Sequence, residues 1–351
     1  MKHSVHALLL ASVFAGVAGL AYAQELAPLN SDTEPDRIDW SELEAQFGPV
    51  PAPAEGTRIG GVSKTLTNEY WRSLGEGYQN VADAQGVEFT YQAAQSEGDQ
   101  LGQLSIAETM ISQGFGALLV SPQTDANLVP AVEAATEAGI PVLNVNDAVI
   151  PSAEHYVGNV QKGNGVNVAQ WFIDNRPDGG KVAIIEGQAG VYAAGQRTAG
   201  FTETIEGAGN FEVVASVPAD WDRQKAYDAA ANILQQNPDL IGFYANNDGM
   251  ALGVVEAVKA AGLQDQVVVF GTDGISDAYA SIRAGDLTGT VDSFPVLTGE
   301  VAMEVALRLM ADQDLPRVVA TPQALITADN IETYATDDMA ALRQALMAPA
   351  Q

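Results

Sequence analysis

From residue 57 onward, short apolar runs rich in β-branched residues alternate with longer segments whose apolar residues recur at helical spacing. The pattern predicts a first series of strands at 58–63, 88–93, 117–120 and 142–145. The first three of these strands are each followed by a predicted helix, at about 69–85, 99–113 and 126–138. Glycines follow these helices at positions that favour a left-handed cap, namely Gly86, Gly114 and Gly139.

A second series of the same kind begins after residues 155–158. Its predicted strands lie at 181–186, 211–216, 240–245 and 267–271, and its predicted helices lie near 192–206, 222–236, 249–261 and 276–284. A further strand at 287–292 leads into an apolar helix near 297–310, and a last strand lies at 324–327. Strands that alternate with helices of this length form parallel sheets through right-handed crossovers. The prediction is therefore an α/β protein with two doubly wound, Rossmann-like lobes.

The first 23 residues have the pattern of a secretory signal peptide. Lys2 supplies the positive charge, residues 7–20 are apolar, and Ala21-Tyr22-Ala23 is a cleavage site of the A-x-A type. The alternative is a membrane anchor, but this apolar stretch is shorter than the ~20 residues that span a bilayer. We therefore expect a secreted chain that starts near Gln24.

Residues 24–56 form an acidic, proline-rich extension, most of which we expect to be extended and mobile. One short helix is predicted within it, because Asp39 can cap it, Glu42 completes a capping box and Gly48 ends it. Its apolar face consists of Trp40, Leu43 and Phe47. Two interpretations of this face remain: it packs back on the protein, or it docks on a partner.

Composition excludes several classes of function. The chain has 351 residues with 45 acidic and 16 basic side chains, a net charge of −29 that disfavours nucleic acid and anionic lipid as partners. It has no cysteine, which rules out disulfides, thiol catalysis and Cys-ligated metals. Once the signal is removed, His155 is the only histidine. Phosphate-loop, dinucleotide, zinc-protease and EF-hand motifs are absent from the sequence, so no cofactor or metal is expected.

The predicted strands are followed by polar and aromatic side chains, and ligands of open parallel sheets bind beyond the carboxyl ends of the strands. The candidates are Lys64, Asn68, Tyr70, Trp71, Asn144, Asn146 and Asp147 in the first series, and Tyr192, Arg197, Asp220, Trp221, Asn246, Asn247, Asp248, Asp273 and Ser293 in the second. Amides, carboxylates and arginine can bind adjacent hydroxyls, while a tryptophan face can stack on the apolar face of a sugar ring. The set predicts a site for a sugar or polyol.

Some of these residues have a structural alternative. Asn144, Asp147, Asp220 and Asp248 could be turn formers or helix caps, and Arg197 could pair with a surface acid. Trp171 lies within a helix in an apolar setting, where we expect it to be part of the core. Trp71 and Trp221 lie among polar loop residues, which favours the cleft over the core.

These strand-end segments resemble those of periplasmic sugar-binding proteins of ABC importers, of the ribose, allose and galactose type and above all its allose-binding members. The resemblance spans about residues 57–330. It rests on Lys64-Thr-Leu-Thr-Asn68-Glu-Tyr-Trp71, Ser96-Glu-Gly-Asp99, Val182-Ala-Ile-Ile-Glu-Gly187, Pro218-Ala-Asp-Trp-Asp-Arg223, Asn247-Asp248 and Gly271-Thr-Asp-Gly274.

The resemblance implies two lobes that close on a ligand around three crossing segments, near 158, 293 and 322. Lobe one would comprise 57–158 plus 294–322, and lobe two 159–293 plus 323–340. In the first lobe, Lys64, Asn68, Tyr70 and Trp71 would contact the sugar. In the second, Arg197 would bind ring hydroxyls, Trp221 would supply the opposing aromatic face, and Asn247 and Asp273 would hold further hydroxyls.

The chain departs from the family pattern at two positions. Asn146 stands where the family usually has a carboxylate, and Ser293 stands where it commonly has glutamine. Asparagine both donates and accepts hydrogen bonds, whereas a carboxylate only accepts, and serine is shorter than glutamine. A pentose, a hexose or an acyclic polyol other than ribose or allose therefore remains open.

The resemblance implies a monomeric periplasmic receptor of a Gram-negative bacterium that delivers a sugar to an inner-membrane permease. The alternative is a sensory receptor of the same fold that presents its closed form to a chemoreceptor or sensor kinase, which only the partner face would distinguish. A glycosidase would need two carboxylates roughly 5–10 Å apart across the bond that it cleaves. Asp273 is the one strong cleft carboxylate in this mapping, so we expect no enzyme.

Overall fold

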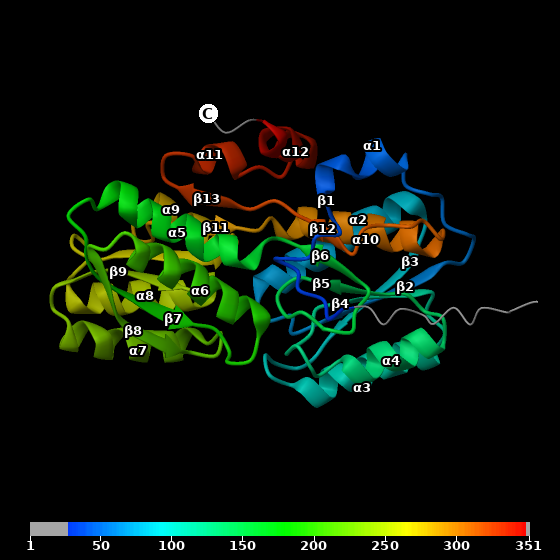
Figure 1. The fold of residues 1–351 in the computed structure, drawn as a ribbon, viewed down its shortest axis with the longest axis horizontal. Helices are drawn as coiled ribbons and strands as arrows, with labels where there is room; N and C mark the ends of the chain where they lie inside the picture. The colour runs from blue at the N-terminus through cyan, green and yellow to red at the C-terminus, as the bar shows by residue number, and fades with distance from the viewer. Residues whose placement is uncertain (1–26, 349–351) are drawn as a thin grey trace, which may run out of the picture.

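The fold was obtained as a computed structural model, which describes residues 27–348. The predicted signal peptide, residues 1–23, lies outside the described residues. The described chain forms two α/β lobes that lie side by side along the longest axis of the molecule (Figure 1). Within residues 27–348, no helix combines the length and the apolar character needed to span a membrane.

The first lobe is built on a seven-stranded parallel sheet with the strand order β1-β12-β6-β5-β4-β2-β3. Its strands are β1 (Arg37–Asp39), β2 (Arg58–Ser63), β3 (Glu88–Ala93), β4 (Ala117–Val120), β5 (Val142–Val145), β6 (His155–Gly158) and β12 (Val318–Ala320). Helices α2 (Glu69–Gln85) and α10 (Pro295–Met310) cover one face of the sheet, and α3 (Gln100–Ser112) and α4 (Val129–Glu137) cover the other (Figure 1).

The second lobe is built on a six-stranded sheet with the order β13-β11-β10-β9-β7-β8, in which β13 alone is antiparallel. Its strands are β7 (Gly180–Glu186), β8 (Phe211–Pro218), β9 (Leu240–Ala245), β10 (Val268–Asp273), β11 (Gly289–Asp292) and β13 (Ala324–Thr327). Helices α5 (Gln161–Asn175) and α6 (Tyr192–Gly207) pack together on one face. Helices α7 (Arg223–Gln236), α8 (Asp248–Ala261) and α9 (Ser276–Arg283) pack on the other.

The chain passes between the two sheets three times: from β6 to α5, from β11 to α10, and from β12 to β13. Parallel strands in both lobes turn their carboxyl ends toward the space between the lobes, which is where the loops expected to bind a ligand lie. The lobe boundaries given above remain our proposal, and this sheet membership supports them.

Glycines bring the helices of each lobe into close contact. A Cβ on Gly77 of α2 would lie 2.0 Å from the carbonyl oxygen of Val296 in α10. In the second lobe, a Cβ on Gly165 of α5 would lie 2.0 Å from the carbonyl oxygen of Arg197 in α6. Neither position tolerates a side chain, so the α5–α6 contact places the backbone of Arg197 directly against α5.

Most predicted elements are present with ends shifted by a few residues. The helix predicted around Trp171 is α5, and Trp171 is partly buried against Phe270 in the second-lobe core. Strands β1 and β12, three residues each, and helices α11 (Ile331–Tyr334) and α12 (Met339–Met347) were not predicted. A three-residue strand is too short to show the two-residue periodicity on which such predictions rest.

The N-terminal extension differs from the expectation that most of it is extended and mobile. It adds β1 to the edge of the first sheet, beside β12. As predicted, Asp39 caps a short helical segment, here a 3-10 turn, η1 (Trp40–Glu42), followed by α1 (Leu43–Phe47). Trp40 and Leu43 are buried in the first-lobe core, against Leu342 of α12. Of the two interpretations of this apolar face, packing on the protein is the one that the structure shows.

Candidate ligand-binding site

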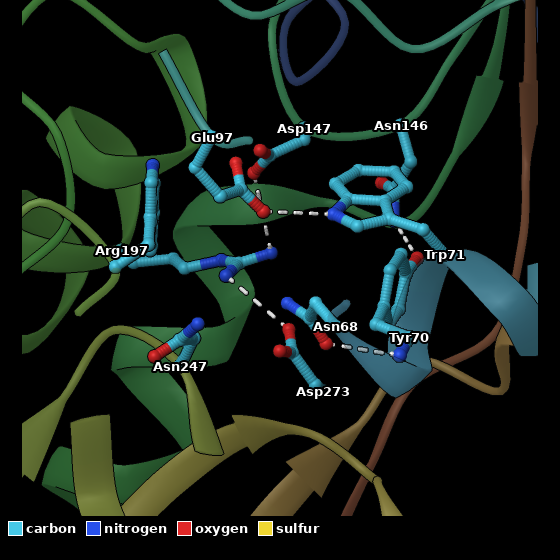
Figure 2. Close-up of a pocket in the computed structure, with 10 residues that line it drawn as sticks. Asn68, Tyr70, Trp71, Glu97, Asn146, Asp147, Arg197, Asn247 and Asp273 are labelled. Carbon is cyan, nitrogen blue, oxygen red and sulfur yellow. Dashed lines mark hydrogen bonds and ion pairs between the residues drawn. The ribbon is translucent and has the colours of Figure 1, made fainter. Parts of the chain in front are cut away.

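A cavity of about 290 Å³ lies between the two lobes at the carboxyl ends of their strands. The side chains that line it come from both lobes and converge on its centre (Figure 2): Asn68, Tyr70, Trp71, Glu97, Asn146, Asp147, Arg197, Trp221, Asn247 and Asp273. The structure therefore brings together nine of the sixteen candidates named in the sequence analysis.

Two asparagines serve both as helix caps and as cavity walls. The Oδ1 of Asn68 accepts the backbone N–H of Tyr70 at the start of α2, at 3.0 Å. The Oδ1 of Asn247 accepts the backbone N–H of Met250 at the start of α8, at 2.9 Å. Because each oxygen is engaged in this way, the side-chain N–H groups are left as donors for a ligand.

Trp71 and Trp221 provide the aromatic walls. The indole N–H of Trp71, which is 3% exposed, donates to Glu97 at 3.0 Å (Figure 2). The ammonium of Lys64 lies 5.6 Å from the ring centroids of both tryptophans, and the guanidinium of Arg197 lies 6.0 Å from that of Trp221. The indole N–H of Trp221 is buried and has no partner within residues 27–348, so it is available to a ligand acceptor.

Arg197, 2% exposed, extends from α6 into the cavity and is held by neutral groups behind it. Its Nε donates to the side-chain oxygen of Gln161 at 2.9 Å, and its Nη1 donates to the backbone oxygen of Asn246 at 2.7 Å. In front, its Nη atoms lie 3.7 Å from Asp273 and 3.8 Å from Asp147. These two carboxylates outweigh the effect of burial and raise the pKa of Arg197, so it stays protonated.

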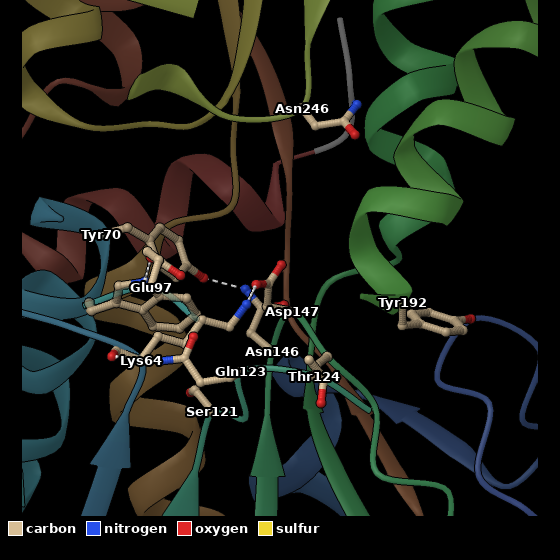
Figure 3. A network of polar contacts seen from close by, with 12 residues as sticks. Lys64, Tyr70, Glu97, Ser121, Gln123, Thr124, Asn146, Asp147, Tyr192 and Asn246 are labelled. Atoms are coloured by element: carbon tan, nitrogen blue, oxygen red, sulfur yellow. Dashed lines mark hydrogen bonds and ion pairs between the residues drawn. The ribbon is translucent and has the colours of Figure 1, made fainter. Parts of the chain in front are cut away.

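The carboxylates of the site are buried among few cations. Burial raises the pKa of Asp273 well above its usual range, although Arg197 acts in the opposite direction. Burial likewise raises the pKa of Glu97, with Lys64 lowering it in part. Lys64, 1% exposed, forms an ion pair with Asp147 at the wall of the cavity (Figure 3). The site thus holds three carboxylates and two cations, and one of the two oxygens of Glu97 has no hydrogen-bond partner in the part of the chain that the structure describes.

Several residues around the cavity have a backbone conformation that side chains rarely adopt. The φ angles are 49° at Asn146, 61° at Asp147, 63° at Trp221 and 137° at Asp273. Each such residue costs of order 1–3 kcal/mol and persists where the surroundings hold it, most often at functional sites. This local strain points the four side chains into one cavity.

Seven of the sixteen candidates do not line the cavity: Lys64, Asn144, Tyr192, Asp220, Asn246, Asp248 and Ser293. Lys64 lies behind the cavity wall, where it pairs with Asp147 and has its ammonium 5.6 Å from the ring centroids of Trp71 and Trp221. Ser293 is fully buried beside the first-lobe cavity wall, and its hydroxyl has no partner among the described residues. Asn144 takes its structural alternative, since its side chain bonds the backbone of Ala148 and Ile150 in the turn that follows it. Asp248 is neither a turn former nor the cap of α8: it lies within the helix and accepts the backbone N–H groups of Gly274 and Ile275 in the loop after β10.

The side-chain oxygen of Asn146 is occupied by protein groups and is not available to a ligand. Its Oδ1 accepts from the side-chain nitrogen of Gln161 at 2.7 Å and from the hydroxyl of Tyr156 at 3.4 Å. Its nitrogen donates to the hydroxyl of Tyr70 (Figure 3). Asn146 can therefore present only an N–H donor to a ligand.

Sequence reasoning missed three residues that build the site. Glu97 lines the cavity, and its signal was its place in the Ser96–Asp99 motif after a strand. Gln123 holds two site loops together, because its side-chain nitrogen donates to the backbone oxygens of Lys64 and Ser96, at 2.8 and 3.1 Å. Gln161 contacts both Arg197 and Asn146. No motif marks either glutamine, since each acts through contacts distant in sequence.

The arrangement suits hydrogen bonding to a polyhydroxylated ligand. Within residues 27–348, no group of three or more acidic or histidine side chains is disposed to hold a metal ion. Donors come from Asn68, Asn247, Arg197 and Trp221, and acceptors come from the three carboxylates. Alternating donors and acceptors beside aromatic faces match vicinal hydroxyls on a ring or short chain.

Several known proteins are similar to this chain in fold and in sequence. The D-allose-binding periplasmic protein of Escherichia coli K12 is 37% identical over 262 residues, which cover 72% of this chain and 83% of that protein. The D-ribose/D-allose-binding protein of Pseudomonas aeruginosa is 33% identical over 288 residues, which cover 78% and 90%. A solved ABC-transporter solute-binding protein of Actinobacillus succinogenes with bound D-allose matches with a TM-score of 0.76 at 30% identity, covering 79% of this chain and 100% of that chain.

A family model described as a periplasmic binding protein domain matches residues 59–314, which include every residue that lines the cavity. Fold, sequence relatives and family model agree, and the chain belongs to the periplasmic binding protein family.

Proposed function

We propose that this protein is the solute-binding receptor of a sugar ABC importer and that it captures a neutral monosaccharide or polyol between its lobes. The observation that carries the proposal is the cavity itself, in which two tryptophans and a set of donors and acceptors from both lobes converge. Its two-lobe construction allows closure around a ligand to bring these groups into contact with it. The relatives that bind D-allose and D-ribose support the same class of ligand.

The charges of the site favour a neutral ligand. The site holds three carboxylates, those of Glu97, Asp147 and Asp273, but two cations, Lys64 and Arg197. Both cations already pair with carboxylates. A sugar acid would add a further negative charge to a poorly solvated site that already has an excess of carboxylate, which is strongly unfavourable. Hydroxyls can donate to the free oxygen of Glu97 and accept from Trp221 without any change of charge.

We infer that the group recognised beside Asn146 is bound differently from one that faces a carboxylate, because Asn146 offers an N–H donor where the resemblance described above implies an acceptor. A hydroxyl proton that a carboxylate would accept meets an N–H group here. A group that only accepts, such as a ring or ether oxygen, or the absence of a hydroxyl, fits this position better. This is the part of the site that should separate one sugar from another.

Delivery to a permease in the inner membrane follows from the same proposal, with the chain acting as a monomer in the periplasm. We propose no hydrolytic activity, because Asp147 and Asp273 are each engaged by a fixed cation rather than left as a free acid and base pair. A chemoreceptor could read the same closed form, so sensing would add a partner without changing the site.

The test is a thermal-shift panel on residues 24–351 with pentoses, hexoses, deoxy sugars, inositols, linear polyols and uronic acids. A ligand at about 100 times its dissociation constant stabilises the fold by about 2.7 kcal/mol, which raises the melting temperature by several degrees. The Trp221→Ala variant should lose the shift, while Trp171→Ala, altered in the second-lobe core, should keep it. A response to uronic acids alone, or a shift that survives Trp221→Ala, would refute the proposal.

A further inference from the structure

The N-terminal extension reaches the binding site through a short chain of buried contacts. The family model begins at residue 59, so the extension lies outside the part of the chain shared with the family. Leu29 bonds Pro151 of the first lobe through its backbone, and Glu34 pairs with Arg317 at 2.8 Å. Between these anchors, residues 30–32 contact the second lobe, where the Tyr192 hydroxyl at the start of α6 donates to Asn30 at 2.8 Å.

Asp32 is the residue of this segment that contacts α5. Its two carboxylate oxygens accept the backbone N–H groups of Gln161 and Lys162, at 3.0 and 2.7 Å. These N–H groups belong to the first turn of α5, where the helix itself provides no partner and a negative charge is stabilising. The residue before the helix, Val160, cannot cap it through its side chain, so Asp32 supplies the cap from a distant part of the chain.

Gln161, fixed in this way, is a fully satisfied buried amide. Its oxygen accepts from the Nε of Arg197 at 2.9 Å and from Asn164 at 3.3 Å. Its nitrogen donates to the side-chain oxygens of Asn146 at 2.7 Å and Asn159 at 3.0 Å. All four hydrogen-bonding positions of the amide are used, which leaves it a single orientation.

This orientation determines how two cavity residues face a ligand. Arg197 donates its Nε to Gln161, so its Nη atoms are directed toward Asp147 and Asp273. The side-chain oxygen of Asn146 accepts from Gln161, so only its side-chain nitrogen faces Tyr70 and the cavity. Without Gln161, the buried Nε–H of Arg197 would lose its acceptor and the Asn146 oxygen would keep only the 3.4 Å contact with Tyr156, so both side chains would be held less firmly.

We propose that Asp32 and Gln161 are positioning residues of the binding site, and that the N-terminal extension, through them, is a working part of the receptor that sets its affinity and selectivity. The effect on affinity rests on the proposed function, whereas the effect on Arg197 does not. Asp32 positions the first turn of α5 by accepting from its backbone, and the Gln161 side chain in that turn positions Arg197 and Asn146 through hydrogen bonds.

The first arm of the test needs no ligand. Solvent exchange of the Arg197 Nε–H is followed by NMR, with the resonance assigned by its loss in Arg197→Lys. In the wild type this proton is donated to Gln161 in a side chain only 3% exposed, so it should exchange slowly. We expect Gln161→Leu and Asp32→Ala to speed its exchange by about tenfold or more, and Asp32→Asn, which keeps one acceptor oxygen, to fall in between.

The matched control is Asp36→Ala in the same extension. The Asp36 side chain accepts only the backbone N–H of Arg317 in the first lobe, at 3.1 Å, and does not touch α5. It should leave Arg197 exchange unchanged. Equal exchange in Asp32→Ala and Asp36→Ala would overturn the proposal, as would faster exchange spread evenly over the whole protein, which would mean a general loss of stability.

The second arm measures the dissociation constant for D-allose by calorimetry. Loss of a hydrogen bond to a charged group predicts about tenfold or weaker binding for Gln161→Leu. Because Asp32 acts through Gln161, the Asp32→Ala/Gln161→Leu double variant should bind within about twofold of Gln161→Leu alone. If the two substitutions instead weakened binding independently, so that their fold-changes multiplied, the action of Asp32 through Gln161 would be refuted. If D-allose does not bind the wild type, that result bears on the ligand class, and the exchange measurement decides the positioning role.

Discussion

The position of Trp221 can be tested by adding a single methyl group to its neighbour. A Cβ on Gly187 would lie 2.1 Å from the Cη2 atom and 2.3 Å from the Cζ2 and Cζ3 atoms of the Trp221 ring. Ordinary contacts begin at 3.4–4 Å, so Gly187→Ala requires the ring to move by 1.3–1.9 Å. The backbone at 187 needs no positive φ, which leaves this collision as the main effect of the substitution.

The magnitude follows from the role of the ring. Complete loss of a buried aromatic anchor costs about 2–4 kcal/mol, or roughly 30- to 700-fold in affinity. A ring displaced by more than 1 Å keeps its size but not its contact with a bound sugar. We therefore expect Gly187→Ala to weaken binding about tenfold or more for the panel compound with the largest thermal shift, as measured by calorimetry. Overpacking should also lower the stability of the free protein by about 1–3 kcal/mol.

Two controls make this prediction sharp. Gly195→Ala, on the exposed side of α6 with no atom near the added methyl group, should bind as the wild type does. In a Trp221→Ala background the added methyl group meets no ring, so Gly187→Ala should then cause little further loss. Binding by Gly187→Ala within twofold of the wild type would show that the position of the Trp221 ring does not matter, and the aromatic wall would lose its assigned role.

Two further predictions concern the hinge and the helix packing. Burial raises the pKa of Asp292, on the β11–α10 crossing, to about 7. The folded state thus holds this proton more tightly than the unfolded chain does, so the free energy of unfolding should rise as pH falls from about 7 toward 4. In urea melts over this pH range, Asp292→Asn should show a pH dependence of the unfolding free energy that is smaller by about 1.4 kcal/mol per pH unit. Unchanged slopes would contradict this assignment. Gly77→Ala should force α2 and α10 apart and lower unfolding free energy by about 1–3 kcal/mol or more in the same melts, whereas Gly207→Ala, with open space around it, should not.

The sequence was sufficient to predict the elements and the edge at which the site lies. Periodicity identified long elements such as α2 and α8, because a buried helical face repeats over several turns. The rule that ligands bind beyond the carboxyl ends of parallel strands then selected loops without any coordinates. Nine of the predicted residues line one cavity, since strand ends in a parallel sheet all face the same way.

The residues that sequence reasoning missed have long-range partners in common. Glu97 is buried against Trp71, 26 positions away, and Gln161 holds Arg197, 36 positions away. A polar residue in a loop or first turn is most often solvated, so its type alone does not separate a surface glutamine from a buried one. Only the fold shows that the Gln161 amide has four hydrogen-bond partners within the protein.

The extension was misjudged for a related physical reason. Its prolines and acids match the composition of segments that stay unfolded because they bury too little apolar surface. That criterion treats a segment as if it folded alone. Here the surface already exists on the lobes: Ile38, Trp40 and Leu43 are buried in the first-lobe core, and Asp32 meets a helix terminus that lacks a partner of its own. An acidic segment becomes ordered when the protein it covers offers unpaired N–H groups, so composition describes such a segment only in isolation.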